Sequence, residues 1–415
     1  MNSIRLHTDK KIISAEISIC GSKSESNRLL ILNSLYGNPI QLKNISDSED
    51  TQILQNALKS NAEIIDIHHA GTAMRFLTAY FSMQAGKEII LTGSDRMKQR
   101  PIGILVDALR TLGAEISYVG EEGFPPLKIM GKKLDHDFVE LNADVSSQFI
   151  TALMLISGKF PNGLTLQLNG KITSLPYLEM TIQLLNQLGL KAERKENKIR
   201  IFPAEKIEKQ DFTIESDWSS VSYFYAMAAL SEMADLKINS YKKLSLQGDS
   251  KLVEIYRKYF GVETQFIGNQ IQLQKKSGVP NKPMELDLNA MPDIAQTVAV
   301  TCAGLKTKCK LTGLETLKIK ETDRLVALQN ELFKVGAISE ITESTLEIID
   351  FIHPEKFPLI KTYEDHRMAM SFTALAMVQD LEIENPEVVK KSYPDFWLDA
   401  EKAGIQSIKK PQDLS

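Results

Sequence analysis

The sequence predicts an α/β fold in which one small unit is repeated six times. The first observation behind this prediction is length, because 415 residues exceed what one hydrophobic core usually serves. The second is the regular spacing of apolar helical stretches, and the third is a glycine turn that recurs at a similar spacing. A fixed period of this kind indicates a repeated structural unit.

Six stretches share one design, with small, polar or charged residues at the start and an apolar run behind. Five of them start at positions 71, 146, 219, 293 and 366, so consecutive starts lie 73 to 75 residues apart. The sixth starts at position 24, only 47 residues before the next. Apolar stretches of this kind are predicted to be buried helices. The ordinary alternation of an α/β protein is the alternative, but it does not predict a near-constant step.

A second, amphipathic helix type lies between these stretches. It ends in a turn, often at glycine, and leads into a pair of strands. The turn glycines lie 72 to 76 residues apart, at Gly113, Gly189, Gly261 and Gly336. Glycine suits the left-handed residue that ends many helices. Each unit is therefore predicted as strand, buried helix, strand, exposed helix and strand pair.

The composition narrows the class of protein. The formal net charge of -4 does not favour nucleic acid or a membrane surface as a partner. The three cysteines lack metal-ligand spacing, which is typical of a reducing cytosolic setting. The first residues alternate like a strand and contain no apolar signal segment, and no apolar run reaches the roughly 18 residues of a membrane span. We therefore expect a soluble cytoplasmic protein.

Unusual polar residues gather at the predicted helix starts. Helix N-termini offer free N–H groups and a positive dipole end, so several of them aimed at one cleft would bind phosphates and carboxylates. Each cluster alone also fits a bland alternative, such as a serine N-cap or a solvated basic turn. The clusters are Gly21 to Arg28, Ala70 to Arg75, Arg96 to Pro101, Ser146 to Gln148 with Ser174 and Tyr177, Asp293, Lys320 to Arg324, Asp365 to Arg367, and Lys391 to Asp395.

Taken in order, these clusters resemble the EPSP synthase family of enolpyruvyl transferases. The matching strings run from residue 21 to 396 and are GSKSESNR, AGTAMR, RMKQRPIG, SSQF, SLPY, QGDS, MPD, KETDR, EDHRMAM and KSYPDF. The resemblance implies a two-domain inside-out α/β barrel of six βαβαββ repeats, three per domain, with the active site in the interdomain cleft. Residues 21–214 would form one half-barrel domain and residues 1–20 with 215–415 the other, with hinges near 20–21 and 215–216.

The resemblance also implies a reaction. The enolpyruvyl group of phosphoenolpyruvate would pass to the 5-hydroxyl of shikimate 3-phosphate, giving EPSP and phosphate in the shikimate pathway to chorismate and the aromatic amino acids. The partners would be these two small molecules, with no nucleic acid and no membrane. We expect no metal or organic cofactor, and a monomer.

Residue roles follow from the matching motifs. Shikimate 3-phosphate would be bound by Lys23, Ser24, Arg28, Ser146, Ser147, Gln148, Ser174, Asp293 and Lys320, with Tyr177 at the border. Phosphoenolpyruvate would be bound by Lys23, Gly71, Arg100, Gln148, Arg324, Arg367 and Lys391. Asp293 would be the base toward the hydroxyl, Glu321 the proton donor and later acceptor, and Lys23 would assist. The sequence departs from the family pattern at His69, Phe76 and Thr316.

Two other functions are compatible with parts of the sequence. A related enolpyruvyl transferase acts on UDP-N-acetylglucosamine and usually carries a reactive cysteine in a loop of its first domain, but residues 92–101 contain none. A non-catalytic module that binds phosphate or nucleic acid would explain the basic helix starts. It predicts a continuous basic face with stacking aromatic residues, which a net charge of -4 and 7% aromatic residues do not suggest.

Overall fold

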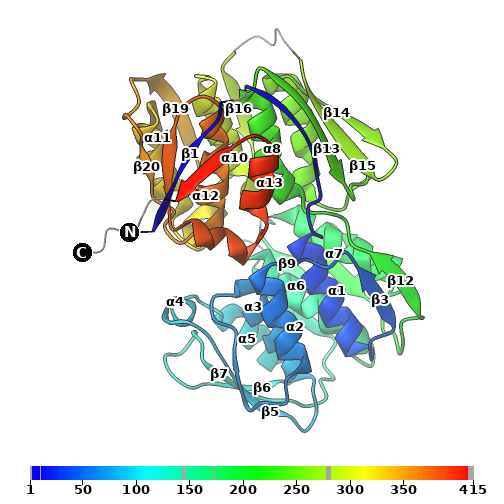
Figure 1. Cartoon of the computed structure of the whole chain (residues 1–415). Helices are drawn as coiled ribbons and strands as arrows, with labels where there is room; N and C mark the ends of the chain where they lie inside the picture. The colour runs from blue at the N-terminus through cyan, green and yellow to red at the C-terminus, as the bar shows by residue number, and fades with distance from the viewer. Residues whose placement is uncertain are drawn as a thin grey trace. The chain divides into compact units, whose positions relative to one another are not determined.

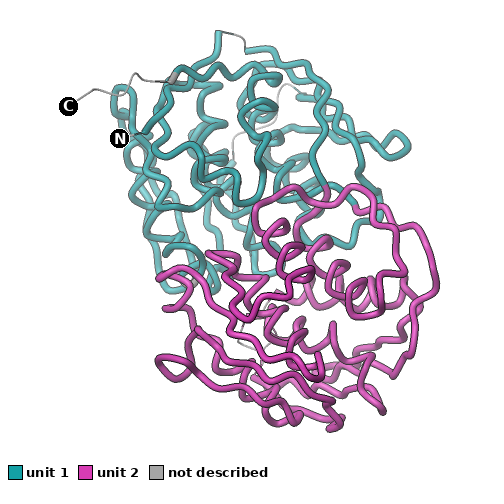
Figure 2. Tube along the Cα trace, turned by 60° about the horizontal axis from the view of Figure 1, so that its bottom comes forward, with its two compact units in different colours: residues 1–20, 215–415 teal, residues 21–214 magenta. Residues whose placement is uncertain are grey.

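The structure, a computed structural model, describes residues 2–9, 11–142, 146–170, 172, 174–276 and 282–409. The chain divides into two compact units (Figures 1 and 2). Unit 1 comprises residues 1–20 and 215–415, and unit 2 comprises residues 21–214. Within the described part of the chain, no helix is long and apolar enough to cross a membrane.

One repeat of unit 2 shows the design clearly. Its first two strands are parallel, and the strand pair adds in antiparallel fashion to give the sheet order β4-β5-β7-β6. In chain order the elements are β4 (Ile64–Asp66), α3 (Gly71–Ser82), β5 (Glu88–Thr92), the short α4 (Asp95–Lys98), α5 (Gly103–Thr111), β6 (Glu115–Tyr118) and β7 (Leu127–Met130). The predicted order of strand, helix, strand, helix and strand pair is therefore present.

The next repeat of unit 2 has the same pattern, with sheet order β10-β11-β9-β8. Its elements are β8 (Phe138–Asn142), α6 (Ser147–Ile156), η1 (Ser157–Lys159), β9 (Leu164–Asn169), α7 (Leu175–Gln187), β10 (Ala192–Lys195) and β11 (Lys198–Ile201).

The remaining repeat of unit 2 is shorter than predicted. It consists of β12 (Gln210–Thr213), α1 (Lys23–Leu35), β3 (Ile40–Lys43) and α2 (Glu49–Lys59), and β12 pairs with β3 in a two-stranded parallel sheet. The chain runs from α2 directly into β4, so this repeat has no strand pair among its described residues. The missing pair accounts for the short step of 47 residues between the first two helix starts.

Unit 1 contains three complete repeats, each with a four-stranded sheet of the same pattern. The first has β2 (Ile12–Ile17), α8 (Trp218–Leu230), β13 (Met233–Asn239), η2 (Gly248–Lys251), α9 (Leu252–Ile255), the π-helical η3 (Tyr256–Phe260), β14 (Val262–Ile267) and β15 (Gln270–Lys275). The second has β16 (Met284–Asp287), η4 (Pro292–Ile294), α10 (Ala295–Gly304), β17 (Cys309–Thr312), η5 (Glu315–Ile319), α11 (Arg324–Lys334), β18 (Ala337–Ile341) and β19 (Leu346–Phe351). The third has β20 (Leu359–Ile360), α12 (His366–Thr373), η6 (Ala374–Met377), β21 (Leu381–Glu384), η7 (Pro386–Lys391), α13 (Phe396–Lys402), β22 (Gln406–Lys409) and β1 (Ser3–His7).

The first helix of each repeat lies in the core of its unit, as the apolar runs predict. Helices α1, α3 and α6 pack together in unit 2, and α8, α10 and α12 pack together in unit 1. Every residue of α8 except Ser219 is buried. A helix that is apolar on all sides has no solvent face and must be covered by neighbours. Because these three helices pack side by side in each unit, their N-terminal residues are the ones available for polar chemistry.

Candidate active site

In unit 2, Arg28 joins three helices. Its side chain is 3% exposed, one turn into α1, where Ser22 caps the helix start by accepting a hydrogen bond from the Glu25 N–H (3.4 Å). The guanidinium donates to the Thr181 hydroxyl of α7 (Nε to Oγ1, 2.8 Å), to the Thr151 hydroxyl of α6 (3.5 Å) and to the Ser24 carbonyl oxygen of α1 itself (2.7 Å). Burial lowers the pKa of Arg28 to about 10, so the side chain remains a cation at neutral pH.

The predicted serine and glutamine ligands lie at the starts of α6 and α7. Ser146 caps α6 by accepting from the Gln148 N–H (3.4 Å), and the Gln148 amide donates to the Thr72 hydroxyl of α3 (3.3 Å). Ser174 precedes α7 in a left-handed conformation with φ of 52° and is 6% exposed, and its hydroxyl makes no cap bond to the helix. The hydrogen bond from Gln148 brings the start of α6 to the start of α3, as a shared anion site requires.

Gly71 and Arg100, both predicted to bind phosphoenolpyruvate, are neighbours in unit 2. A Cβ atom built on Gly71 would lie 2.6 Å from Nη1 of Arg100. The guanidinium therefore covers the first residue of α3, where a side chain would displace it. Lys23 lies in the same unit, and its Nζ is 3.4 Å from Oδ2 of Asp50 on α2.

In unit 1, Asp293 is surrounded by cations. Its carboxylate oxygens lie 3.2 Å from Nη1 of Arg324, 3.2 Å from Nη2 of Arg367 and 3.8 Å from Nζ of Lys320. Arg367 also donates to the Asp293 carbonyl oxygen (3.0 Å). Asp293 is the second residue of η4 and precedes the first residue of α10 by two positions, so it is the N-cap residue of neither helix.

Arg324 is the centre of this second cluster and is 1% exposed. Besides Asp293, it donates to Glu321 (Nη2 to Oε2, 2.8 Å) and to the fully buried Asp365 (Nε to Oδ2, 2.6 Å). Burial lowers the pKa of Arg324, but the Asp365 and Glu321 carboxylates outweigh it and hold the pKa above the ordinary value. For Lys320 burial dominates, and its pKa lies below the ordinary value despite Asp293. One buried guanidinium thus bridges both predicted acid/base residues.

The last predicted cation, Lys391, ends η7. Its Nζ donates to the carbonyl oxygen of Glu364, the residue before Asp365 (2.9 Å). The arrangement therefore brings Lys391 next to the Asp365–Arg367 turn at the start of α12.

Two residues that hold the predicted cations, Asp365 and Thr181, receive no assigned role in the prediction from sequence. Asp365 caps α12 by accepting from the Arg367 N–H (2.8 Å) while it holds Arg324, and Thr181 holds Arg28. The sequence contains a signal for Asp365, because it stands in the EDHRMAM string directly before a predicted helix. No comparable signal marks Thr181, which contacts Arg28 across 153 positions of the chain.

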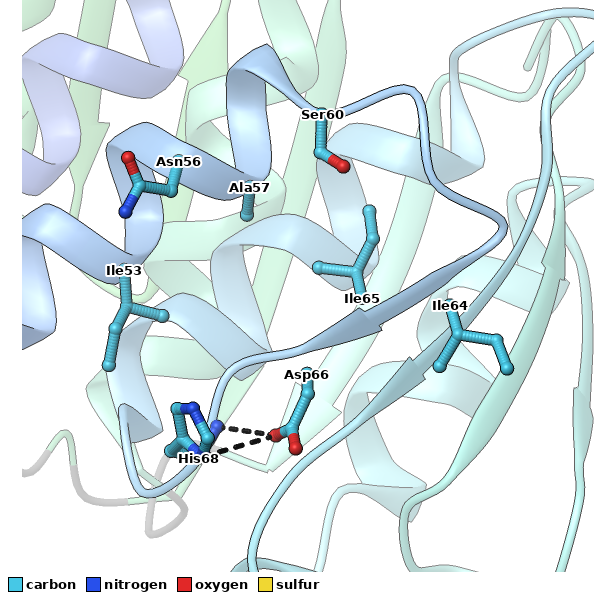
Figure 3. A pocket seen from close by; sticks show the side chains of 8 residues that line it. All are labelled: Ile53, Asn56, Ala57, Ser60, Ile64, Ile65, Asp66 and His68. Carbon is cyan, nitrogen blue, oxygen red and sulfur yellow. Dashed lines mark hydrogen bonds and ion pairs between the residues drawn. The ribbon is translucent and has the colours of Figure 1, made fainter.

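A separate depression of about 240 Å³ lies in unit 2 between the end of α2 and β4 (Figure 3). Apolar side chains such as Ile53 and Ile65 line it, together with Asp66 and His68, whose backbone N–H donates to Asp66 (2.7 Å). None of the predicted site residues lines this depression. Among the residues that the structure describes, no group of three or more His, Cys, Asp or Glu side chains could hold a metal ion.

Comparison with known proteins shows the family of the chain. Residues 54–399 match the profile of EPSP synthase (3-phosphoshikimate 1-carboxyvinyltransferase). The 3-phosphoshikimate 1-carboxyvinyltransferase of Bacteroides fragilis (strain YCH46) is 45% identical over 396 residues, which cover 95% of this chain and 96% of the relative. The enzyme of the same name from Shewanella pealeana is 35% identical over 428 residues, covering 96% and 98%.

Solved structures show the same fold at low sequence identity. An EPSP synthase from Acinetobacter baumannii superposes with a TM-score of 0.77 at 20% identity and covers 98% of this chain and 100% of its own. The enolpyruvyl transferase NikO from Streptomyces tendae superposes with a TM-score of 0.75 at 14% identity, covering 99% of each chain. From the profile match and the 45% identity together, the chain belongs to the EPSP synthase family of enolpyruvyl transferases.

Proposed function

We propose that the chain transfers the enolpyruvyl group of phosphoenolpyruvate to the 5-hydroxyl of shikimate 3-phosphate, releasing phosphate. Membership of the family makes the chain a 3-phosphoshikimate 1-carboxyvinyltransferase. The observation that carries the residue assignment is the pair of carboxylates, Asp293 and Glu321, bridged by the single buried guanidinium of Arg324. Two carboxylates held close together, each in a different environment, suit a reaction that moves two protons.

The proton transfers assign one role to each carboxylate. Asp293 removes the proton of the substrate hydroxyl as its oxygen attacks C2 of phosphoenolpyruvate. Glu321 delivers a proton to the methylene carbon, which becomes a methyl group in the tetrahedral adduct. Glu321 then takes a proton back from this methyl group as the bond from C2 to the phosphate oxygen breaks, and phosphate leaves with the electron pair. Well-placed groups of this kind each contribute typically 10²–10⁴-fold to the rate.

The cations perform a different task. Arg324 and Arg367 present fork-shaped donors that match carboxylate and phosphate groups, which a lysine cannot do. We assign Arg100, Arg324, Arg367, Lys23 and Lys391 to phosphoenolpyruvate, with the start of α3 at Gly71 and the amide of Gln148. We assign the serine-rich starts of α1, α6 and α7 to shikimate 3-phosphate, together with three charged residues. The residues at the helix starts are Lys23, Ser24, Ser146, Ser147, Gln148 and Ser174, and the charged residues are Arg28, Asp293 and Lys320. Holding two anions in one orientation is itself worth up to about 7–11 kcal/mol.

These assignments divide the binding residues between the two compact units. The starts of α1, α3, α6 and α7 belong to unit 2, whereas Asp293, Glu321 and Arg324 belong to unit 1. The proposed reaction therefore needs both units of the chain. We propose that they act as the two half-barrel domains of the family, joined near positions 20–21 and 215–216, and that the chain works as a monomer.

The decisive experiment measures phosphate release by the purified protein from shikimate 3-phosphate and phosphoenolpyruvate. Release that requires both substrates is expected. No release when both substrates are present in excess would refute the proposal. The variant Glu321→Gln tests the proton role, because it keeps the shape of the side chain but cannot carry the proton. It should bind shikimate 3-phosphate normally and lose about 10²–10⁴-fold in kcat.

The matched control is Glu343→Gln. This carboxylate also forms an ion pair, at 2.6 Å with Lys318, but its side chain is 89% exposed. Its kcat should equal that of the unmodified protein. If Glu321→Gln keeps full kcat, Glu321 is not the proton donor.

A further inference from the structure

The segment that leads from β20 to α12 contains a strained turn. Its two central residues, Tyr363 and Glu364, are both left-handed, with φ of 52° and 57°. A hydrogen bond from the Asp365 N–H to the Thr362 carbonyl oxygen closes the turn (2.8 Å). Left-handed residues at both central positions are the pattern of a type I′ turn, which favours asparagine, aspartate or glycine. Tyrosine and glutamate are unfavourable there, so contacts from outside the turn are needed to hold it.

Three cations of the proposed site contact this turn. The Glu364 carbonyl oxygen accepts a hydrogen bond from Nζ of Lys391 (2.9 Å). The next residue, Asp365, accepts from the Arg324 side chain (2.6 Å) and from the Arg367 N–H (2.8 Å). The direction of the backbone at these two residues therefore decides where the three cations lie.

Glu331 of α11 anchors the turn from outside. Strand β20 lies beside α11 in unit 1 (Figure 1). The Glu331 side chain is fully buried, and its Oε1 accepts from the Tyr363 hydroxyl (2.8 Å) while its Oε2 accepts from the Lys361 N–H (3.0 Å). Lys334 pairs with Oε2 at 2.6 Å and also donates to the Leu359 carbonyl oxygen of β20 (2.9 Å). The carboxylate thus fixes both the chain before the turn and the first of its two central residues.

Arg324 and Glu331 hold the turn from the same helix. They lie seven positions apart on α11, which is about two helical turns, so both are on one face of the helix. Arg324 contacts the end of the turn and Glu331 contacts its middle. Burial, with the Glu331 carboxylate, raises the pKa of Tyr363 to about 12, so the hydroxyl keeps its proton and remains a donor at neutral pH.

We propose that Glu331 is a positioning residue for phosphoenolpyruvate, because it holds the left-handed turn that places Lys391 and Arg367. This inference rests on the proposed function, since both cations are assigned there to phosphoenolpyruvate. When the bond between Tyr363 and Glu331 is lost, the turn relaxes to other backbone conformations for part of the time. Only the fraction of molecules with the turn formed binds phosphoenolpyruvate well, so KM rises as this fraction falls, while kcat at saturation is kept.

The first test is Tyr363→Phe, which removes one hydroxyl from a partly exposed side chain and should leave the fold intact. A hydrogen bond to a charged acceptor is strong enough to change the turn equilibrium about tenfold. KM for phosphoenolpyruvate should therefore rise about tenfold, with kcat and KM for shikimate 3-phosphate unchanged. Glu331→Gln should show the same selective rise together with a lower melting temperature.

Tyr225→Phe is the matched control, because it also removes a buried hydroxyl bond of unit 1, to Thr264 at 2.7 Å, between α8 and β14. Its KM for phosphoenolpyruvate should equal that of the unmodified protein. An unchanged KM in Tyr363→Phe, or an equal rise in the control, overturns the proposal.

A rescue experiment separates the conformation of the turn from a general loss of stability. Asparagine adopts the left-handed conformation more readily than glutamate, and it keeps the carbonyl group that accepts from Lys391. Adding Glu364→Asn to Tyr363→Phe should therefore return KM for phosphoenolpyruvate to near its original value. If the double variant keeps the raised KM, the turn is not the cause and the proposal fails.

Amide hydrogen exchange separates this inference from the proposed function. The Asp365 N–H is protected by its bond within the turn, so it should exchange about tenfold faster in Tyr363→Phe. If the protein releases no phosphate from the two substrates, the proposed function fails, and the exchange rate still shows whether Tyr363 holds the turn. If phosphate is released but Asp365 exchanges equally fast in both proteins, Glu331 does not hold the turn through Tyr363 and the positioning role is refuted.

Discussion

Replacing Gly71 by alanine tests the geometry of the proposed phosphoenolpyruvate site. The new Cβ would lie 2.6 Å from Nη1 and 3.2 Å from Cζ of Arg100. Because unstrained contacts between heavy atoms lie near 3.5–4.0 Å, the guanidinium must withdraw by about 1 Å. It is the free end of a long side chain, so the fold should accommodate the change. A displacement of about 1 Å at a substrate-holding group costs up to about 10²-fold in activity.

The expected result is therefore a selective loss. KM for phosphoenolpyruvate, measured by phosphate release at saturating shikimate 3-phosphate, should rise about 10- to 100-fold. Thermal stability should stay equal or increase, because alanine is favoured over glycine in a helix by about 1 kcal/mol. Gly103→Ala is the matched control: Gly103 is also the first residue of its helix, but its Cβ would meet no atom closer than 3.4 Å. An unchanged KM in Gly71→Ala, or an equal rise in the control, refutes the reasoning.

Three further substitutions test the buried charges. Arg324→Lys should destabilise unit 1 by about 3–5 kcal/mol in denaturant unfolding, because lysine cannot hold the buried Asp365 with two donors. Arg28→Lys should raise KM for shikimate 3-phosphate about tenfold or more in steady-state kinetics, because the bond to Thr181 is lost. Burial, with the Asp293 carboxylate, raises the pKa of Asp249 to about 7, so its contribution to stability is greatest at low pH. That contribution falls as pH rises from 3.8 to about 7, so urea midpoints of the unmodified protein should decline relative to Asp249→Asn over this window.

Much of the fold is predictable from the sequence because the helices and turns of the repeat are determined by residues that are close together in the chain. The apolar stretches form buried helices, and all four turn glycines, Gly113, Gly189, Gly261 and Gly336, have the left-handed φ that the sequence predicts for them. What the local signal cannot show is strand partnership. β3 pairs with β12, which lies 170 positions later in the chain, and no pattern in either strand identifies the other. The short step at position 24 signals the shortened repeat, but not which elements it lacks.

The candidate site is also predictable from the sequence only in part. Motif strings identify the cations and Asp293, and the structure places Arg324, Arg367 and Lys320 within 3.8 Å of that carboxylate. The partners that hold these cations are less visible, because they lie far along the chain. Asp365 contacts Arg324 across 41 positions, and Thr181 contacts Arg28 across 153. A short motif predicts which charged residues belong to the site, whereas the packing of the folded chain determines which partner each of them contacts.

The cation cluster of unit 1 leads to a last prediction, which concerns Asp293→Asn. In the absence of substrate, Asp293 neutralises part of the charge of Arg324, Arg367 and Lys320. Asparagine keeps the shape of the side chain and removes its charge, so a bound anion should interact more strongly with the three cations. Although turnover is lost, phosphoenolpyruvate should raise the melting temperature of Asp293→Asn by more than that of the unmodified protein. A tenfold gain in affinity corresponds to about 1.4 kcal/mol at saturation, or about 2–4 °C.

Asp380→Asn is the control for this experiment, because it breaks an ion pair of similar length, 2.8 Å with Arg5, whose side chains are both 38% exposed. Its shift with phosphoenolpyruvate should equal that of the unmodified protein. A shift in Asp293→Asn that is equal or smaller would mean that phosphoenolpyruvate does not draw on the cations that Asp293 holds. Arg324 and Arg367 would then be structural ion-pair partners, and the assignment of both arginines to the substrate would have to be abandoned.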